Sequence, residues 1–226
     1  MTGRVGGWLV HSNQKLGVKM ESKYFYKAMS NFYDLIDVIY FRNYNNSPRK
    51  KVFESIGDKD RVLDLCTGTA TNALKISKSR PLSKVVGIDL SKDMLIVARD
   101  KIQKERLSNI KLYYMDATDL RFRDKCFDKI LLSLVLHEVD ENVAEKILTE
   151  AKRVLKDDGE IIVTEWRESD SLLHKAIFFP IKILEPKPFK TFIKKDLYQY
   201  FELYGLTIVS EEKCDYSKVL KLKKII

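Results

Sequence analysis

Three carboxylates between residues 64 and 116 each stand where a short apolar run ends. Asp64 falls within the run 62–65, Asp89 closes the run 84–89, and Asp116 follows the run 110–115. Carboxylate oxygens accept hydrogen bonds from hydroxyl and amino groups, and an acid after the second strand of a parallel sheet is placed to bind both hydroxyls of a ribose. Singly, each acid could equally be an ordinary loop residue. Together they predict one nucleoside-binding site at the carboxyl edge of a parallel sheet.

The segment Cys66-Thr-Gly-Thr-Ala70 follows the first acid and leads into a helical pattern. Its small residues Gly68 and Ala70 let the backbone approach a ligand closely. Dinucleotide sites cradle a pyrophosphate with three glycines, whereas this turn has one, so we expect an adenosyl ligand without phosphates. Cys66 is either a reactive thiol or, as we prefer, a small residue tolerated beside the ligand.

Apolar runs that alternate with amphipathic segments must position these residues. Ser91 is a predicted N-cap for a helix with one apolar side, and Asp140 is expected to cap a second amphipathic helix. The apolar side of the first helix consists of Met94, Leu95, Val97, Ala98 and Ile102. The pattern predicts an α/β fold, a Rossmann-like doubly wound sheet of seven strands with the last strand antiparallel. The expected strands are 62–65, 84–89, 110–115, 127–133, 160–164, 206–210 and 219–225, and the later helices are 142–155, stopped by Asp157-Asp-Gly159, and 194–204.

The regions outside this alternation predict a flexible extension, a lid and an insertion on a single domain. Residues 1–20 have no periodicity and are expected to be the extension, while 21–226 form the domain. Residues 21–56 carry aromatic residues at helical spacing, typical of core or of a helical lid. Residues 167–191 form an insertion on the substrate side, whose apolar stretch 172–184 predicts a pocket wall or core; an exposed apolar segment of this kind could also make peripheral contact with a membrane.

Composition narrows the class of protein. The 226 residues carry a net charge of +9, which raises affinity for polyanions, but the lysines are scattered, and those in 218–224 alternate as on an edge strand that faces water. We therefore disfavour nucleic acid as a partner. No run is long enough to span a membrane, no signal peptide is recognisable, and three widely spaced cysteines form neither a disulfide framework nor a zinc pattern. We expect a cytoplasmic protein without a metal, and the sequence leaves its oligomeric state open.

Five ordered segments resemble the motifs of class I S-adenosylmethionine-dependent methyltransferases. They are most similar to the branch that contains the ubiquinone/menaquinone-biosynthesis C-methyltransferases, although that branch has an Arg-Asn pair where this chain has His137-Glu138. The segments are 62–70, 86–95, 115–120, 127–139 and 153–166.

The resemblance implies S-adenosyl-L-methionine as cofactor and S-adenosyl-L-homocysteine as product. By resemblance, Met94 lies over the adenine, Asp116 accepts the adenine amino group, and Tyr24 and Tyr33 belong to a lid over the substrate. The cofactor-binding residues are then Asp64, Cys66, Gly68, Asp89, Leu90, Met94, Asp116, Ala117 and Ser133, and the substrate-side residues are Tyr24, Tyr33, Glu138 and Trp166.

Methyl transfer from a sulfonium is an in-line displacement, so placing the acceptor beside the methyl group supplies most of the catalysis. His137 is the expected catalytic residue, as a base for a phenol, hydroxyl or acidic carbon, or else a polar residue that only lines the site. We expect a small or lipid-like, partly apolar acceptor. The alternatives are a non-catalytic S-adenosylmethionine sensor and an RNA or protein methyltransferase.

Overall fold

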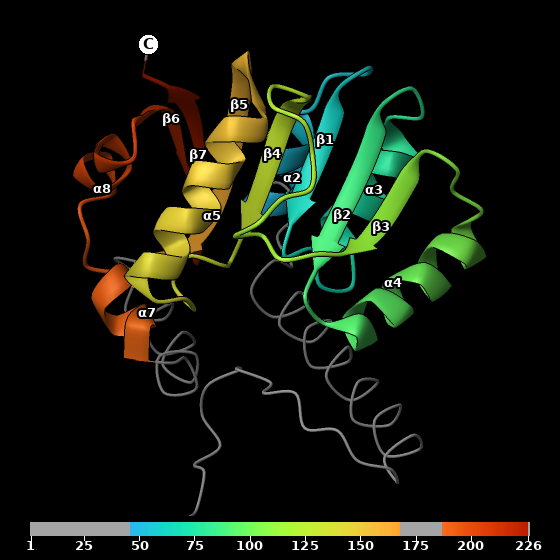
Figure 1. Cartoon of the computed structure of the whole chain (residues 1–226), viewed down its shortest axis with the longest axis horizontal. Helices are drawn as coiled ribbons and strands as arrows, with labels where there is room; N and C mark the ends of the chain where they lie inside the picture. The colour runs from blue at the N-terminus through green and yellow to red at the C-terminus, as the bar shows by residue number, and fades with distance from the viewer. Residues whose placement is uncertain (1–45, 168–186, 226) are drawn as a thin grey trace, which may run out of the picture.

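A computed structural model describes residues 46–167 and 187–225, and their core is one seven-stranded sheet. The strand order is β3-β2-β1-β4-β5-β7-β6, which Figure 1 shows from β6 on the left to β3 on the right. The chain starts in the middle at β1, builds outward to β3 and returns to β4, so the sheet is doubly wound. The strands are β1 Arg61–Leu65, β2 Lys84–Asp89, β3 Ile110–Tyr114, β4 Phe127–Ser133, β5 Leu155–Trp166, β6 Leu206–Lys213 and β7 Ser217–Lys224.

The first five strands are parallel, and β7 runs antiparallel to both β5 and β6. The central strands bury apolar side chains on both faces, because helices cover both sides of a parallel sheet. Val62, Leu63 and Leu65 of β1, for example, have no exposed surface. The expected fold class, including the antiparallel last strand, is confirmed, and the carboxyl ends of β1, β2, β4 and β5 meet at one edge.

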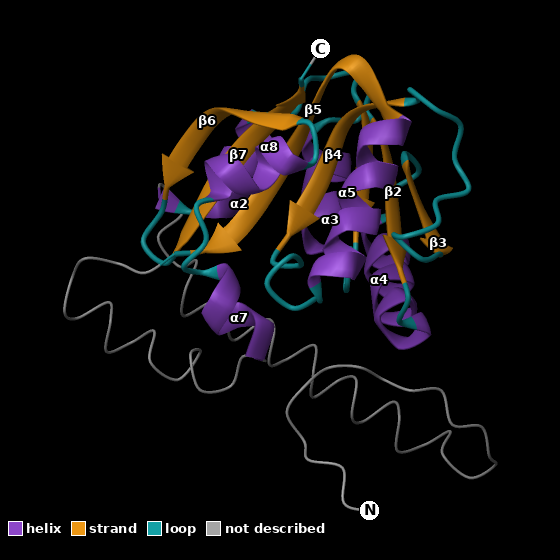
Figure 2. Cartoon of the chain, turned by 60° about the vertical axis from the view of Figure 1, so that its left-hand side comes forward, coloured by secondary structure: helices purple, strands orange, loops and turns teal. Residues whose placement is uncertain are grey.

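Helices pack on both faces of the sheet (Figure 2). Residues of helices α2, α3 and α4 form one buried apolar cluster with one face of the sheet. Residues of α5 and α8 form a second cluster with the opposite face. Ser91 accepts a hydrogen bond from the Met94 backbone N–H and so caps α4 as expected. The helices are α2 Pro48–Glu54, α3 Thr71–Ser79, α4 Lys92–Glu105, α5 Glu141–Val154, α7 Lys187–Phe192 and α8 Leu197–Leu203.

Several boundaries differ from the sequence-based expectation. The α5 helix ends at Val154, and Asp157-Asp-Gly159 lies inside β5, not in a loop that stops the helix. A Cβ atom on Gly159 would lie 2.6 Å from Leu155 Cδ1 and 2.8 Å from the Asp128 carbonyl oxygen, so close packing is what requires glycine there. The helix expected over 194–204 is shorter, because Asp196 caps α8 by accepting from the N–H groups of Tyr198 and Gln199.

The prediction that 218–224 form an edge strand is wrong, because β7 lies between β5 and β6 and the edge strand is β6. Val219, Leu220 and Leu222 of β7 are buried. Desolvation lowers the pKa of Lys218, which is half-buried rather than facing water. The alternation of apolar residues and lysines in 218–224 thus reflects the two faces of an interior antiparallel strand, which pack differently.

Parts of the predicted extension, lid and insertion lie outside the described residues and stay predictions. These parts are the whole extension 1–20, residues 21–45 of the lid and residues 168–186 of the insertion. Within the described part of the chain, no helix is long and apolar enough to cross a membrane.

Candidate functional site

The carboxyl ends of β1 and β2 are joined by hydrogen bonds from the turn between β1 and α3. Asp64 accepts a hydrogen bond from the Thr67 hydroxyl at 2.6 Å. Asp89 accepts from the Gly68 backbone N–H at 2.8 Å through Oδ2, and from the Ser91 N–H at 2.7 Å through Oδ1. The two acids therefore flank the turn, as the sequence predicts.

Burial changes the ionisation of both carboxyl groups. Asp64 is 2 % exposed, and desolvation raises its pKa to about 6, while the Thr67 hydroxyl and the Arg49 charge act in the opposite direction. Desolvation also raises the pKa of Asp89, although backbone N–H groups of Ser91, Gly68 and Leu90 oppose the shift. Buried carboxylates of this kind gain from a ligand that brings a positive charge or hydroxyl donors.

The turn has the left-handed backbone that close ligand approach requires. Cys66, Gly68 and Ala70 have φ angles of 54°, 56° and 60°, and two of the three are not glycine. Left-handed conformations of residues with a Cβ carry strain, which concentrates at functional sites. Leu134, directly after β4, has φ 59° and belongs to the same edge of the sheet.

Cys66 is exposed at its surface, yet desolvation around the sulfur raises the pKa of its thiol, and so do the carboxylates of Asp89, Asp64, Glu138 and Asp116, in that order. Like charges disfavour a thiolate whatever the exposure, so Cys66 is a neutral thiol. This favours the interpretation of Cys66 as a small residue beside the ligand. The acids expected at the three strand ends, Asp64, Asp89 and Asp116, therefore all act electrostatically on the same thiol.

The remaining predicted cofactor residues lie around the ends of β2 and β3. Asp116 Oδ1 accepts from both the N–H and the hydroxyl of Thr118, each at 2.8 Å, and among the described residues no hydrogen bond reaches Oδ2. Leu90 is 56 % exposed, an unusual exposure for a leucine, and Met94 is half-buried at the start of α4. Ala117 is buried in the main core, so its side chain contributes packing rather than an open surface.

His137 forms a buried pair with Glu165 across the ends of β4 and β5. Its Nδ1 lies 2.5 Å from Glu165 Oε2, and Glu165 Oε1 accepts the Leu136 N–H at 2.9 Å. His137 and Glu165 are each 1 % exposed. A carboxylate on Nδ1 favours the tautomer with its proton on that atom, which makes Nε2 the basic nitrogen.

Apolar side chains surround this pair on the substrate side. The His137 ring meets the Phe189 ring of α7 edge to face, with centroids 5.5 Å apart. Phe189 belongs to a cluster with Trp166 and Tyr216, against which Leu134 and Ile193 pack. Glu138 is exposed, with an oxygen 3.9 Å from His137 Nε2. Tyr24 and Tyr33 lie outside the described residues.

Arg49, Asn72 and Thr164, which the sequence analysis did not predict, extend the site toward α2. Arg49 Nη1 donates to Asn72 Oδ1 at 2.8 Å, and Asn72 Nδ2 donates to Ser133 Oγ at 3.0 Å. These residues, with Thr164, line a cavity of about 40 Å³. Asn72 could have been predicted, because it lies in the first turn of the helix that follows the glycine turn. No local sequence pattern marks Arg49 or Thr164 as site residues.

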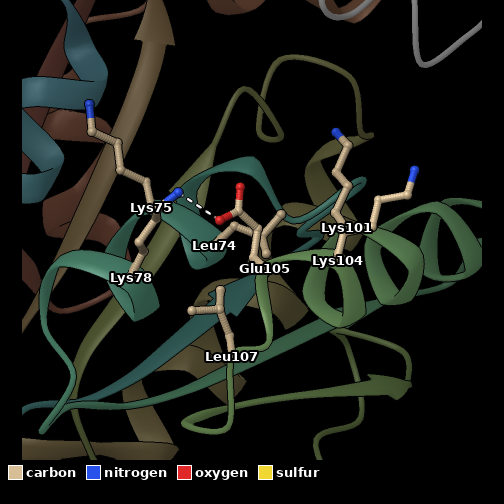
Figure 3. A pocket seen from close by; sticks show the side chains of 7 residues that line it. All are labelled: Leu74, Lys75, Lys78, Lys101, Lys104, Glu105 and Leu107. Carbon is tan, nitrogen blue, oxygen red and sulfur yellow. Dashed lines mark hydrogen bonds and ion pairs between the residues drawn. The ribbon is translucent and has the colours of Figure 1, made fainter.

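A larger groove of about 320 Å³ lies between α3 and α4 (Figure 3). It gathers lysines that appear scattered along the sequence, namely Lys75, Lys78, Lys101 and Lys104. Lys78 pairs with Glu105 at 2.6 Å, and Lys101 donates to the Thr69 hydroxyl at 3.1 Å. Part of the positive charge of the groove is therefore already paired.

The described residues contain no group of three or more histidine, cysteine or acidic side chains that could hold a metal ion.

A doubly wound seven-stranded sheet with an antiparallel β7, and with acids at or next to the carboxyl ends of its first three strands, defines a class I S-adenosylmethionine-dependent methyltransferase. A methyltransferase-domain family model matches residues 56–205, and the chain belongs to this methyltransferase family. It is an enzyme whose cofactor is S-adenosylmethionine.

Curated relatives and a solved structure agree with this assignment. The chain is 32 % identical over 186 residues to a ubiquinone/menaquinone biosynthesis C-methyltransferase of Citrifermentans bemidjiense, covering 80 % of this chain and 78 % of the relative. It is 30 % identical over 193 residues to a demethylmenaquinone methyltransferase of Staphylococcus saprophyticus, with 83 % and 81 % covered. A S-adenosylmethionine-dependent methyltransferase from Aquifex aeolicus shares the fold with a TM-score of 0.67 at 22 % identity, covering 87 % of this chain and 97 % of that one.

Proposed function

We propose that this enzyme methylates a small or lipid-like, partly apolar acceptor whose reacting atom lies beside His137. The observation that carries the proposal is the buried His137–Glu165 pair next to the apolar cluster of Trp166, Phe189 and Tyr216. An apolar wall with one oriented polar group is typical of a site for a small molecule. The names of the relatives, which refer to quinone biosynthesis, support an acceptor of this kind.

Each residue has a defined role in this proposal. S-adenosylmethionine supplies the methyl group and, through its sulfonium, the leaving group. Asp89 accepts the ribose hydroxyls, Asp116 the adenine amino group, and Leu90 and Met94 cover the adenine. Asp64, opposite Arg49, attracts the positive end of the amino-acid part. His137 takes the proton of the acceptor through Nε2, while Glu165 holds Nδ1.

The buried apolar surroundings contribute by keeping water out. Trp166 and Phe189 are 4 % and 1 % exposed, so charges that develop near them act in a poorly screened environment. The acceptor is then held in line with the methyl group, which supplies most of the rate enhancement.

The experiment that tests the proposal measures S-adenosylhomocysteine production over a panel of acceptors. The panel contains phenols, reduced quinones and lipids, with RNA and a basic protein as the competing classes. Turnover on the small or lipid-like acceptors, with little on the macromolecules, is the expected result. Strong turnover on RNA or protein alone would overturn the acceptor class, and cofactor binding without turnover on any acceptor would favour the sensor alternative.

A further inference from the structure

The groove between α3 and α4 combines an apolar bottom with a basic rim. Leu74 and Leu107 line it and pack against the buried cluster beneath the two helices, so they form its bottom. In Figure 3, Leu74 and Glu105 lie between the lysine side chains of α3 and those of α4. The volume of about 320 Å³ is that of a small-molecule site. An occupant that uses the whole groove must therefore be apolar at one end and anionic at the other.

Two of the four lysines supply the charge that an anion would meet. Lys78 is paired with Glu105 at 2.6 Å, and Lys75 has a further interaction, so neither is counted toward that charge. The hydrogen-bond partner of Lys101 is an uncharged hydroxyl group, which leaves its positive charge in place. Lys104 is exposed in the last turn of α4. Lys101 and Lys104 thus place two positive charges on the α4 side of the groove.

The lining residues favour a lipid over the other anions that a basic groove could bind. Single-stranded nucleic acid binds to basic tracks that also carry aromatic side chains for the bases, and none of the residues that line this groove is aromatic. A soluble phosphate would make no use of the two leucines. An acidic phospholipid offers a phosphate for the ammonium groups, and a glycerol backbone and the start of an acyl chain for the leucines. Lysines commonly lay their methylene groups along apolar surface in this way and keep the charge in water.

We propose that this groove binds an acidic phospholipid and so docks the enzyme on an anionic membrane surface. Lys101 and Lys104 contact the phosphate, and Leu74 and Leu107 contact the apolar part of the lipid. Lys101 also donates to the hydroxyl of Thr69 in the turn between β1 and α3, so the groove borders the cofactor site. Docking would hold that site beside the membrane, where a lipid-like acceptor is found. Only this use of the docking rests on the proposed function.

The test measures how the intact protein sediments with vesicles, without cofactor or acceptor. Vesicles of equal parts phosphatidylglycerol and phosphatidylcholine should bind the protein, and vesicles of phosphatidylcholine alone should not. Lys104→Gln should lower the partition coefficient about fivefold, the usual contribution of one lysine near an anionic surface. Glu105→Gln should raise it about threefold, because it removes a negative charge and releases Lys78 from its ion pair.

Two neighbouring residues of α5 provide matched controls on the opposite face of the sheet. Glu145→Gln and Lys146→Gln make the same changes of net charge at exposed positions outside the groove. Both should leave the partition coefficient within about a factor of two. Lys104 and Glu105 are exposed as well, so their variants should keep the melting temperature and the affinity for S-adenosylhomocysteine of the wild type.

Absence of binding to the anionic vesicles would overturn the proposal, and so would equal effects of Lys104→Gln and Lys146→Gln, which would indicate net charge rather than the groove. Calorimetry with glycerol 3-phosphate and with a short RNA covers the other anions. Binding of either one that is lost in Lys104→Gln, without binding of vesicles, would assign the groove to that ligand and exclude the lipid. None of these measurements involves turnover, so a failure of the role proposed for His137 leaves their outcome unaffected.

Discussion

His137 and Glu165 lie 28 residues apart in the chain, yet the Nδ1 atom of His137 is 2.5 Å from the Glu165 carboxylate, and both side chains are buried. The second oxygen of Glu165 accepts the Leu136 N–H, so the carboxylate is held from both sides. Two neighbouring parallel strands, β4 and β5, bring the two residues together. A carboxylate fixed in this way orients the imidazole and selects its tautomer.

Glu165→Gln should lower kcat about a hundredfold, the usual scale of a general-base effect. With its oxygen facing the Leu136 N–H, the glutamine would turn its NH₂ group toward His137 Nδ1. That nitrogen would then have to accept, the proton would move to Nε2, and the base would be lost. Affinity for S-adenosylhomocysteine should change little, and His137→Ala should give a similar loss of turnover. Steady-state kinetics and calorimetry measure the two quantities.

The control for this prediction is Glu160→Gln, the same substitution on the same strand at a residue that pairs with Lys129. It should leave kcat within about a factor of two. Normal turnover of Glu165→Gln on the true acceptor would reduce the pair to a structural contact. In that case His137 only lines the site.

Asp89→Ala should weaken S-adenosylhomocysteine by about thirtyfold or more. The substitution removes the acceptor for the ribose hydroxyls, a loss of roughly 2 kcal/mol, and it also releases the Gly68 N–H from the turn. Asp119→Ala removes an exposed acid near the next strand end and serves as the control. An affinity of Asp89→Ala equal to that of the wild type, measured by calorimetry, would exclude the ribose role.

Asp64→Asn should stabilise the ligand-free protein at pH 8 and weaken its affinity for the cofactor. Because the pKa of Asp64 is about 6 in the folded protein and 3.8 as its ordinary value, its contribution to stability is fully present below pH 4 and is lost as the pH rises through 6. The loss amounts to up to about 3 kcal/mol at pH 8. Urea unfolding at pH 5 and pH 8 should show the larger gain at pH 8, with about half of that gain already present at pH 5.

The same ionisation predicts that affinity for S-adenosylmethionine falls as the pH drops through about 6, because protonated Asp64 no longer attracts the ammonium group. The Asp64→Asn protein should lack this pH dependence in calorimetry. A wild-type affinity that is level between pH 5 and pH 7 would argue against Asp64 as the partner of a positive group.

Gly87→Ala should destabilise the protein by about 1–3 kcal/mol and weaken cofactor binding. A Cβ atom on Gly87 would lie 2.8 Å from Leu112 Cδ2 and 3.0 Å from Thr67 Cγ2, so Thr67 would be pushed away from Asp64. Gly57→Ala is the control, since its Cβ would meet only the flexible Asp60 side chain. Thermal unfolding with and without S-adenosylhomocysteine measures both effects, and a wild-type response of Gly87→Ala would show that Thr67 does not depend on this packing.

Local patterns in the sequence were sufficient to predict most of the helices and strands and the part of the site around Asp64, Gly68 and Asp89. The apolar runs of β1, β2 and β4 and the Ser91 cap depend on neighbours within a few residues, so they can be recognised without the fold. Asp64, Gly68 and Asp89 could be placed together because parallel strands end at one edge of the sheet.

The tertiary structure decided which distant residues complete the site. Strand order places Glu165 on His137, and it brings Ser133 within hydrogen-bonding distance of Asn72, 61 residues away. It also puts β7 in the interior of the sheet, where alternation had indicated an edge, and gathers the lysines of α3 and α4 around one groove. Such contacts depend on the order and register of the strands. The packing of the whole core determines that order and register, so they cannot be predicted from any short segment of the sequence.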